Sequence, residues 1–583
     1  MKKLMLGNEA VARGAYEAGV TVATAYPGTP STEITENIAK YDDIYSEWSP
    51  NEKVALEVAI GASVAGARAI CSMKHVGLNV AADPLFTVSY TGVNGGLVIM
   101  VADDPGMHSS QNEQDSRYYA RASKIPMLEP ADSSECKDFV KEAFKISEDF
   151  DTPVIVRLTT RIAHSQSIVE INEKDDYVLK EYKKDFNKFV MMPAMARKRH
   201  IEVEKRMVKL GDFSSKSSFN QIEWGRKDIG IITSGISYQY SKEVFGDVSY
   251  LKLGMVYPLP IDLIKEFAKE VDTLYVVEEL EPFIEDEIKK SGIKVIGKEL
   301  LPVTGEFSAK IIKDKILGVD EATSSNTGIN LQAPVRPPVM CPGCPHRGVF
   351  YILKKLKLIV TGDIGCYTLG ALPPIEGIDT CVCMGASIGM AHGIEKARGK
   401  DFRKKTVAIL GDSTFIHSGI TGLIDIVYNK GNSTVIILDN SITGMTGHQH
   451  NPSTGYTIKG EPTKQVDLVK LAYAIGIERV KIVDPNDLKK LEQVIKEETE
   501  ADEPSLIIAQ RPCALLKYVK FEGPLKINKD KCTRCKMCMK IACPAIVDNG
   551  SFIEVNEALC VGCNLCTQVC KFNAFERVGD NNG

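Results

Sequence analysis

The chain has 583 residues, of which 44% are hydrophobic and 25% charged, and its formal net charge is −5 at pH 7. This length corresponds to roughly four domains, the composition is that of globular proteins, and the slightly acidic balance argues against a nucleic-acid partner. The apolar stretch 4–6 is too short for a signal peptide, and no apolar run approaches the length of a membrane span. We therefore expect a cytoplasmic protein whose sixteen cysteines are thiolate ligands in a reducing compartment rather than disulfides.

Short apolar runs alternate with helical patterns over most of the chain, a rhythm typical of parallel α/β sheets. A lysine-rich stretch at 170–226 interrupts this rhythm and is predicted to form solvated helix and linker. A second break, at 320–338, is rich in Ser, Thr, Asn and Pro. The runs predicted to be strands are 21–26, 97–102, 153–158, 229–233, 273–277, 407–410 and 434–438.

These breaks indicate a multidomain α/β protein with a small cysteine-rich domain after its last sheet. The predicted order is an α/β domain at 1–165, a charged linker at 166–226, an α/β domain at 227–318, a linker at 319–338, an α/β domain at 339–520 and a cysteine-rich domain at 526–583.

A motif for a cofactor-bound metal lies in the third α/β domain. The predicted strand 407–410 ends in Gly-Asp-Ser, and the strand 434–438 ends in Asp-Asn. In a parallel sheet both strand ends open onto one crevice, where ligands bind. This arrangement resembles the thiamine diphosphate signature, in which the Asp and the Asn hold Mg²⁺, an ion that prefers six oxygen ligands. A lone Gly-Asp after a strand more often marks a turn, but the second strand favours a metal site. The predicted cofactor-binding residues are Gly411, Asp412, Ser413, Asn440 and Ile442, with Asp412, Asn440 and the carbonyl of Ile442 on Mg²⁺.

Thiamine enzymes also need a carboxylate from a different domain, which makes the aminopyrimidine of the cofactor a base and so generates the ylid that serves as electron sink. The segment 51–63 places an acidic residue at the start of a helix of small residues, and we predict that Glu52 has this role. Glu57 on the same helix is the alternative. Glu52 could also do no more than favour the helix N-terminus electrostatically.

Eight cysteines near the end of the chain form two ferredoxin-type runs. Each run has three cysteines separated by two residues and a fourth after a longer gap. In bacterial two-cluster ferredoxins the fourth cysteine of each run binds the other cluster. Zinc sites and disulfides are the alternatives, but zinc sites usually take two CxxC pairs. We assign Cys532, Cys535, Cys538 and Cys570 to one [4Fe–4S] cluster, and Cys560, Cys563, Cys566 and Cys543 to the other.

Taken together, these motifs resemble the 2-oxoacid:ferredoxin oxidoreductases. The order and fusion of the parts are most similar to the α subunits of members that act on indolepyruvate, and the likeness covers essentially the whole chain. It implies that 1–165 is a pyrimidine-binding domain, 227–318 a transketolase C-terminal-like domain and 339–520 a diphosphate-binding domain. The resemblance rests on the run YPGTPS at 26–31, the helix at 52–67, CPGCPHRG at 341–348, Gly365-Cys366, the GDS and DN strand ends, MTGHQ at 445–449 and the terminal two-cluster module.

The resemblance also implies residues that contact the substrate. Thr29 matches the threonine that meets the substrate carbonyl in the pyruvate enzymes. Those enzymes hold the substrate carboxylate with an arginine, and the corresponding segment 102–108 contains none. Lys74, His75 and His108 are the candidates for this task, and each has an alternative role as a structural or solvated polar residue.

A third, proximal [4Fe–4S] cluster is implied by four further cysteines. In related enzymes a CxxC pair, a Gly-Cys and a late Pro-Cys bind it, and CxxC is a metal-ligand spacing. The alternative is that they are small buried apolar residues, which we expect of Cys71, Cys136, Cys381 and Cys383. The predicted ligands of the proximal cluster are Cys341, Cys344, Cys366 and Cys513.

The activity implied is oxidative decarboxylation of a 2-oxoacid, with electrons passing through iron–sulfur clusters to ferredoxin and the acyl group to coenzyme A. The implied substrates are indolepyruvate, phenylpyruvate and 4-hydroxyphenylpyruvate, from anaerobic catabolism of aromatic amino acids. A smaller β subunit is expected as partner, in a heterodimer or α2β2 assembly, because related enzymes carry one further domain.

Three alternative functions remain open. The same chemistry could act on pyruvate, 2-oxoisovalerate or 2-oxoglutarate. A non-redox thiamine decarboxylase or synthase would leave the cysteine runs unexplained. An electron-transfer subunit with an inactive thiamine fold would not need the thiamine residues.

Overall fold

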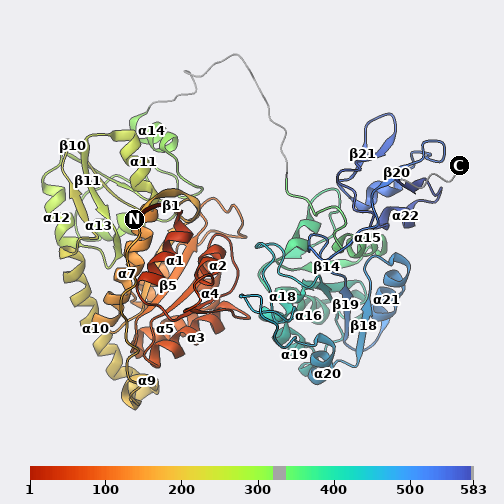
Figure 1. The fold of residues 1–583 in the computed structure, drawn as a ribbon, viewed down its shortest axis with the longest axis horizontal. Coiled ribbons are helices and arrows are strands. Elements are labelled where there is room, and N and C mark those ends of the chain that lie inside the picture. Colours follow the sequence, from red (N-terminus) through yellow and green to blue (C-terminus); the bar gives the residue numbers. More distant parts are fainter. Residues whose placement is uncertain (319–336, 579–583) are drawn as a thin grey trace. The chain divides into compact units, whose positions relative to one another are not determined.

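The computed structural model describes residues 1–318 and 337–578, which form two compact units, one before and one after residues 319–336 (Figure 1). The predicted linker at 319–338 lies almost entirely outside the described residues. None of the helices in the described parts is long and apolar enough to cross a membrane.

The first unit contains a seven-stranded sheet in the order β12-β6-β7-β5-β4-β2-β3. Its strands are parallel except β12, which pairs antiparallel with β6. The strands are β2 (Val22–Ala25), β3 (Tyr45–Trp48), β4 (Ala69–Lys74), β5 (Leu97–Asp103), β6 (Met127–Leu128), β7 (Val154–Thr159) and β12 (Met255–Tyr257). The helices around it are α1 (Gly7–Glu17), α2 (Thr32–Ile38), α3 (Glu52–Val64), α4 (His75–Val80), α5 (Ala82–Thr91), α6 (Ser116–Ser123), α7 (Ser133–Asp149) and α8 (Thr160–His164).

Helices cover both faces of this sheet, which explains its unbroken apolar strands. All seven residues of β5 are buried. Because successive side chains of a strand point to opposite faces, Leu97, Ile99 and Val101 pack with α3 and α5, whereas the residues between them pack with α1 and α7.

A smaller sheet in the order β13-β10-β11-β9 completes the first unit. Its strands are β9 (Gln221–Glu223), β10 (Arg226–Ser234), β11 (Val248–Leu253) and β13 (Thr273–Val277), and its helices are α11 (Gly235–Phe245), α12 (Ile261–Lys269), α13 (Phe283–Lys290) and α14 (Ala309–Leu317). The two sheets are not separated as the predicted boundaries suggest. Strand β12 follows β11 in the chain but joins the larger sheet, and Leu251, Val256 and Phe267 share a core cluster with α3 and β5.

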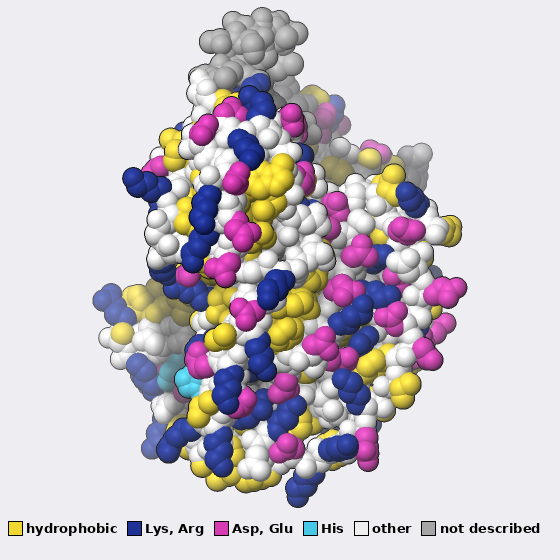
Figure 2. Space-filling model, turned by 90° about the vertical axis from the view of Figure 1, so that its left-hand side faces the viewer, with side chains coloured by type: hydrophobic (Ala, Val, Ile, Leu, Met, Phe, Trp, Pro, Cys, Tyr) yellow, Lys and Arg dark blue, Asp and Glu magenta, His cyan; other side chains and the backbone are white. Residues whose placement is uncertain are grey.

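The charged segment predicted as linker is largely folded onto the first unit. It forms β8 (Gln166–Glu170), which pairs with β1 (Lys2–Leu6), then α9 (Phe186–Phe189) and α10 (Pro193–Lys216). Val203, Arg206 and Leu210 of α10 are buried, and the guanidinium of Arg206 donates to the carbonyl of Ser89 at 2.6 Å. The remaining face carries charged side chains together with the exposed Ile201 and Val208, and Figure 2 shows basic and acidic side chains interspersed with hydrophobic ones over this side of the unit.

The second unit is built on a six-stranded, fully parallel sheet in the order β15-β14-β16-β17-β19-β18. Every residue of β16 and β17 is buried. The strands are β14 (Ile359–Gly362), β15 (Thr380–Cys381), β16 (Thr406–Gly411), β17 (Thr434–Asp439), β18 (Arg479–Val483) and β19 (Ser505–Gln510). The helical segments are α15 (His346–Leu356), η2 (Cys366–Ala371), α16 (Ala386–Arg398), α17 (Lys400–Arg403), α18 (Asp412–Thr414), η3 (Phe415–Gly419), α19 (Ile420–Tyr428), α20 (Leu468–Ile475) and α21 (Leu488–Glu500).

A small module follows this sheet and packs on it. Ile541, Ile546 and Leu565 of the module belong to the same core cluster as α15 and α21. Its elements are β20 (Leu525–Ile527), η4 (Met537–Ile541), β21 (Ile546–Asp548), β22 (Ile553–Val555), α22 (Leu565–Val569) and β23 (Phe575–Arg577). The seven runs predicted to be strands form β2, β5, β7, β10, β13, β16 and β17, and the α/β fold class is confirmed.

Candidate functional site

The carboxylate predicted to act on the cofactor lies at the start of helix α3. Asn51 caps this helix, because its side chain accepts a hydrogen bond of 2.9 Å from the backbone N–H of Val54. Glu52 is the first helical residue and is only 4% exposed. A Cβ atom at Gly77 would lie 2.7 Å from Cγ and Oε1 of Glu52. The absence of a side chain at Gly77 therefore leaves space for the carboxylate of Glu52.

The alternative carboxylate on α3 has different surroundings. Glu57 is exposed, and its Oε1 lies 3.9 Å from Nζ of Lys53. The same Nζ lies 2.9 Å from the carboxylate of Asp83. These are ordinary surface ion pairs, so the geometry favours Glu52 as the residue that acts on a cofactor.

Thr29 lies in the loop after β2, and Lys74, the last residue of β4, lies against this loop. A Cβ atom at Gly28 would meet Cγ and Cδ of Lys74 at 3.2 Å. Nζ of Lys74 donates to the carbonyl of Ser109 at 3.0 Å, and Oγ of Ser109 donates to the carbonyl of Thr29 at 3.3 Å. Burial lowers the pKa of Lys74, and the charges of nearby carboxylates, Glu52 among them, oppose this shift. Lys74 is therefore close to both predicted catalytic residues.

The two histidine candidates contact other groups. His75 is fully buried, and its Nε2 lies 3.1 Å from the carbonyl oxygen of Asn112. His108 has a half-exposed side chain, and its Nε2 lies 3.1 Å from the carboxylate of Glu306. Of the three candidates for the substrate carboxylate, the geometry favours Lys74.

Asp412, the predicted Mg²⁺ ligand, directly follows β16 and is 2% exposed. Its Oδ2 accepts hydrogen bonds from Oγ of Ser453 at 2.7 Å and from Nδ2 of Asn451 at 3.2 Å. Burial raises the pKa of Asp412 to about 7, and the nearby charge of Asp439 contributes to the rise. A divalent cation would oppose that rise, so the residues present fit a metal ion.

Asn440 connects the predicted Mg²⁺ site to two cysteines. Its side-chain oxygen accepts a hydrogen bond of 3.3 Å from the N–H of Ile442. Its backbone carbonyl accepts one of 2.9 Å from the N–H of Cys513. A Cβ atom at Gly444 would lie 3.3 Å from Sγ of Cys366 and 3.8 Å from Nδ2 of Asn440.

The other predicted diphosphate residues lie at the same strand end. Gly411 closes β16, and a Cβ atom there would lie 2.9 Å from the ring of Tyr367. Ser413 accepts a hydrogen bond of 3.0 Å from the hydroxyl of Thr443. The strand end therefore brings together the main chain of β16 and the loop after β17.

The structure adds three polar residues that the sequence analysis missed. Asn451 and Ser453 contact Asp412, as described above. Asp363, fully buried at the end of β14, accepts hydrogen bonds from the N–H groups of Gly385 at 2.9 Å and Ser387 at 3.0 Å. For Asp363, its position just after an apolar strand was the available signal; Asn451 and Ser453 follow no strand.

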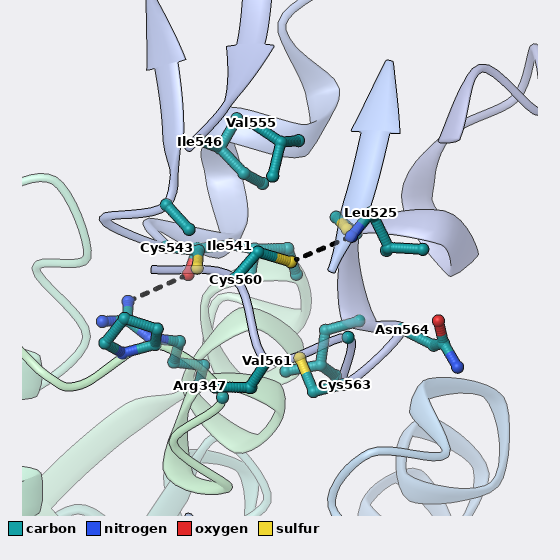
Figure 3. Close-up of a pocket in the computed structure, with 16 residues that line it drawn as sticks. Arg347, Leu525, Ile541, Cys543, Ile546, Val555, Cys560, Val561, Cys563 and Asn564 are labelled. Atoms are coloured by element: carbon teal, nitrogen blue, oxygen red, sulfur yellow. Dashed lines mark hydrogen bonds between the residues drawn. The ribbon is translucent and has the colours of Figure 1, made fainter. Parts of the chain in front are cut away.

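The terminal cysteines line two cavities. Each cavity takes three cysteines from one run and the fourth from the other. Four cysteine thiolates are the ligand set of a [4Fe–4S] cluster, so the residues present fit one. The first cavity is lined by Cys543, Cys560, Cys563 and Cys566 (Figure 3), and the second by Cys532, Cys535, Cys538 and Cys570.

Backbone N–H groups point at two of these sulfurs. The N–H of Leu525 donates to Sγ of Cys560 at 3.4 Å (Figure 3), and that of Ala574 donates to Sγ of Cys570 at 3.4 Å. Hydrogen bonds to the sulfurs are among the features that set cluster potentials. Within the described ranges, no three His, Cys, Asp or Glu side chains are arranged to hold a single metal ion.

The four cysteines of the predicted proximal set come from three loops of the second unit and influence one another electrostatically. Burial raises the pKa of Cys366 to about 11, with contributions from Cys513 and Cys341. Burial raises the pKa of Cys344 to about 12, with contributions from Cys366 and Cys341. Sγ of Cys513 also lies 3.8 Å from Nε2 of His448.

The four remaining cysteines differ from one another. Cys71 and Cys136 are buried, as expected, but Cys381 and Cys383 are exposed. The prediction that these two are buried apolar residues is wrong, because the two-residue strand β15 lies at the edge of its sheet.

Comparison with known proteins gives three family matches. The model for the thiamine-binding part of pyruvate flavodoxin/ferredoxin oxidoreductases matches residues 13–228. The model for the C-terminal TPP-binding domain of thiamine pyrophosphate enzymes matches 363–509. A 4Fe-4S binding domain matches 553–576.

Among solved structures, a 2-oxoglutarate:ferredoxin oxidoreductase from Magnetococcus marinus has a TM-score of 0.47 at 18% identity, covering 54% of this chain and 65% of that one.

Curated relatives match over nearly the full length. The indolepyruvate oxidoreductase subunit IorA of Archaeoglobus fulgidus is 40% identical, covering 100% of this chain and 98% of the relative. The subunit of the same name from Pyrococcus horikoshii is 41% identical, covering 99% and 97%. The chain therefore belongs to the IorA family of indolepyruvate oxidoreductase subunits and is a 2-oxoacid:ferredoxin oxidoreductase with thiamine-binding and iron–sulfur domains.

Proposed function

We propose that this protein carries out the oxidative decarboxylation of aryl 2-oxoacids with coenzyme A, releasing CO2 and an arylacetyl-CoA and passing two electrons to ferredoxin. Indolepyruvate, phenylpyruvate and 4-hydroxyphenylpyruvate are the proposed substrates. The names of the full-length relatives support the first of these. The other two share its aromatic side chain and its 2-oxoacid group.

One observation supports the coupling of thiamine chemistry to electron transfer. Asn440 of the predicted Mg²⁺ site accepts a hydrogen bond from the backbone of Cys513, and Cys366 lies beside Gly444 in the loop that follows. The diphosphate site and the proximal cysteines are thus built from the same strand ends. A non-redox decarboxylase would have no use for this arrangement.

Thiamine diphosphate, when bound, supplies the electron sink for decarboxylation. Within that reaction, Asp412, Asn440 and the carbonyl of Ile442 would hold Mg²⁺ on the diphosphate. Glu52, buried beside Gly77, would hold a proton at the aminopyrimidine of the cofactor. Thr29 would meet the substrate carbonyl.

The ammonium group of Lys74 would bind the substrate carboxylate in place of the arginine of related enzymes. Its contacts with the Thr29 loop and its burial support this role.

The iron–sulfur ligands would form three [4Fe–4S] clusters. The proximal set would be Cys341, Cys344, Cys366 and Cys513, which the contacts of Cys513 and Cys366 near Asn440 support. The two terminal sets would be the cysteines that line the two cavities. When bound, such clusters would supply one-electron transfer, so that the two electrons of one turnover could pass to ferredoxin singly.

A smaller β subunit is proposed to complete the enzyme in the cytoplasm, as a heterodimer or α2β2 assembly. The relatives are themselves named as subunits, which supports a partner chain.

The deciding experiment is anaerobic viologen reduction by the purified complex with a panel of 2-oxoacids, with and without coenzyme A. We expect the three aryl substrates to give higher kcat/KM than pyruvate, 2-oxoisovalerate or 2-oxoglutarate. Equal activity on pyruvate would contradict the aryl assignment. Decarboxylation without viologen reduction would contradict redox coupling altogether.

A further inference from the structure

A buried arginine lies between the proximal cysteines and one terminal set. Arg347, in the first turn of α15, is 2% exposed. A guanidinium does not lose its proton in proteins, so a positive charge is buried here. Burying a charge is costly unless hydrogen bonds satisfy it, and the partners of Arg347 show what it connects.

The guanidinium donates its hydrogen bonds to backbone carbonyls. These carbonyls belong to two different loops. On one side, Nε donates to the carbonyl of Cys341 at 3.0 Å and Nη2 donates to that of Met340. On the other side, Nη1 donates to the carbonyl of Ile541 at 3.4 Å (Figure 3) and to that of Ala542. Met340 directly precedes the CPGC run, and Ala542 directly precedes Cys543. The arginine therefore ties the two cysteine loops together.

The same two loops are also packed directly against each other. Pro342, Gly343 and Arg347 line the cavity of the Cys543 set. A Cβ atom at Gly343 would lie 2.3 Å from Cγ2 of Val561, and Figure 3 shows Val561 between Arg347 and Cys563. The second terminal cavity is lined by residues of the terminal module alone.

Predicted cluster ligands of both sets surround this arginine. The carbonyl of Cys341, in the proximal set, accepts one of its hydrogen bonds, and Cys543 and Cys563 of the terminal set line the same pocket as Arg347. One buried cation is thus shared by both sets.

We propose that Arg347 is a positioning residue that fixes the proximal cluster against the Cys543 cluster, and that its charge raises the reduction potential of both. This inference rests on the proposed function, because it takes both cysteine sets to hold clusters. One electron leaves the reduced proximal cluster and enters the oxidised Cys543 cluster without any bond forming or breaking. The 2-oxoacid is the reductant. A nearby fixed cation stabilises the more negative, reduced form on each side, since charge is among the factors that set cluster potentials.

The test is a redox titration monitored by electron paramagnetic resonance on the Arg347→Met variant of the holoenzyme, together with its iron content. We expect the potentials of the proximal and Cys543 clusters to fall, with at least about a tenfold change in the ratio of oxidised to reduced cluster, or about 59 mV for a one-electron couple. The potential of the Cys532 cluster should move least. Arg347→Lys, which keeps the charge, should stay near the wild-type potentials.

The matched control is Arg403→Met. Arg403 is also 2% exposed in the same unit, and its guanidinium donates to the carbonyls of Asn432 and Ala501 at 3.1 and 2.6 Å. Neither partner is near a predicted cluster ligand in sequence, so this variant should leave all three potentials unchanged.

Potentials that are unchanged in Arg347→Met at full iron content would overturn the proposal. If the methionine variant does not accumulate, Arg347→Gln, which keeps a hydrogen-bond donor without the charge, answers the same question. A wild-type protein with about eight irons instead of about twelve, at four per cluster, would instead refute the proximal cluster and with it the proposed electron path.

Discussion

At the scale of single residues, burial decides between the two carboxylates of α3. Glu52 is buried against Gly77, whereas Glu57 lies in a surface ion pair. We expect Glu52→Gln to retain thiamine diphosphate and Mg²⁺, because the predicted Mg²⁺ ligands lie in the second unit. Turnover should fall by at least about 10²-fold, as expected for loss of a proton-transfer group. Cofactor content and viologen reduction measure both effects, with Glu57→Gln as control, and near-normal turnover of Glu52→Gln would transfer the role to Glu57.

Gly77 offers a steric test of the same site. Gly77→Ala places a Cβ atom within 2.7 Å of the Glu52 side chain, so the carboxylate must shift. We expect turnover to drop by about tenfold or more, since small displacements of catalytic groups are costly. Gly61→Ala on α3 is the matched control, because a Cβ atom there would meet nothing within 4 Å. Equal turnover of the two variants would show that the position of Glu52 is not critical.

Lys74 gives a prediction about pH. Burial lowers its pKa below that of an ordinary lysine, so its charge, present below that pKa, is lost as pH rises through it. We expect KM for the 2-oxoacid to rise on the alkaline side while kcat changes less. Lys74→Met should show a raised KM without this pH dependence, and Lys74→Arg should keep a low KM to higher pH. A KM profile that is identical in wild type and Lys74→Met would exclude contact with the substrate carboxylate.

At the scale of elements, the strand ends of the second unit bring the predicted cofactor residues together. Strands β16 and β17 are parallel neighbours, so Asp412 and Asn440 follow them at one edge of the sheet. Strand β19 pairs with β17 and brings Cys513 to the same edge. The loops after three strands thereby place two predicted Mg²⁺ ligands and Cys513 of the predicted proximal set at one edge of the sheet.

The cysteine after β19 tests this assembly. Three cubane clusters hold about twelve irons, and we expect Cys513→Ala to lose about four of them. Ferredoxin reduction should be abolished while thiamine binding persists. Cys383→Ala, which removes an exposed cysteine of the same unit, should keep its full iron content. An unchanged iron count in Cys513→Ala would rule out the proximal site.

At the scale of the whole molecule, the chain matches its curated relatives over nearly their entire length, and those relatives are named as subunits. We expect the chain purified alone to bind its cofactors but to lack full coenzyme A-dependent activity. Co-expression with a smaller partner should restore that activity, as measured by arylacetyl-CoA formation. Full activity of the isolated chain would contradict a required β subunit.

The sequence by itself predicted those features that depend on local spacing. Strands buried on both faces need continuous apolar runs, so β5, β16 and β17 could be predicted. The cysteine intervals predicted which four cysteines would line each terminal cavity, because the ferredoxin pattern fixes the exchange of the fourth ligand. Asp412 and Asn440 could be found because both follow strands.

Other features depend on contacts between segments that are distant in the sequence, and only the tertiary structure showed them. Periodicity could not show that β12 crosses to the larger sheet, that Cys381 lies on an edge strand, or that Asn451 and Ser453 reach Asp412. The preference for Glu52 over Glu57 came from Gly77, which lies on another helix. The place of Arg347 between two cysteine sets came from the packing of the terminal module against α15. Each of these features depends on burial by residues far along the chain, and local sequence patterns do not encode such burial.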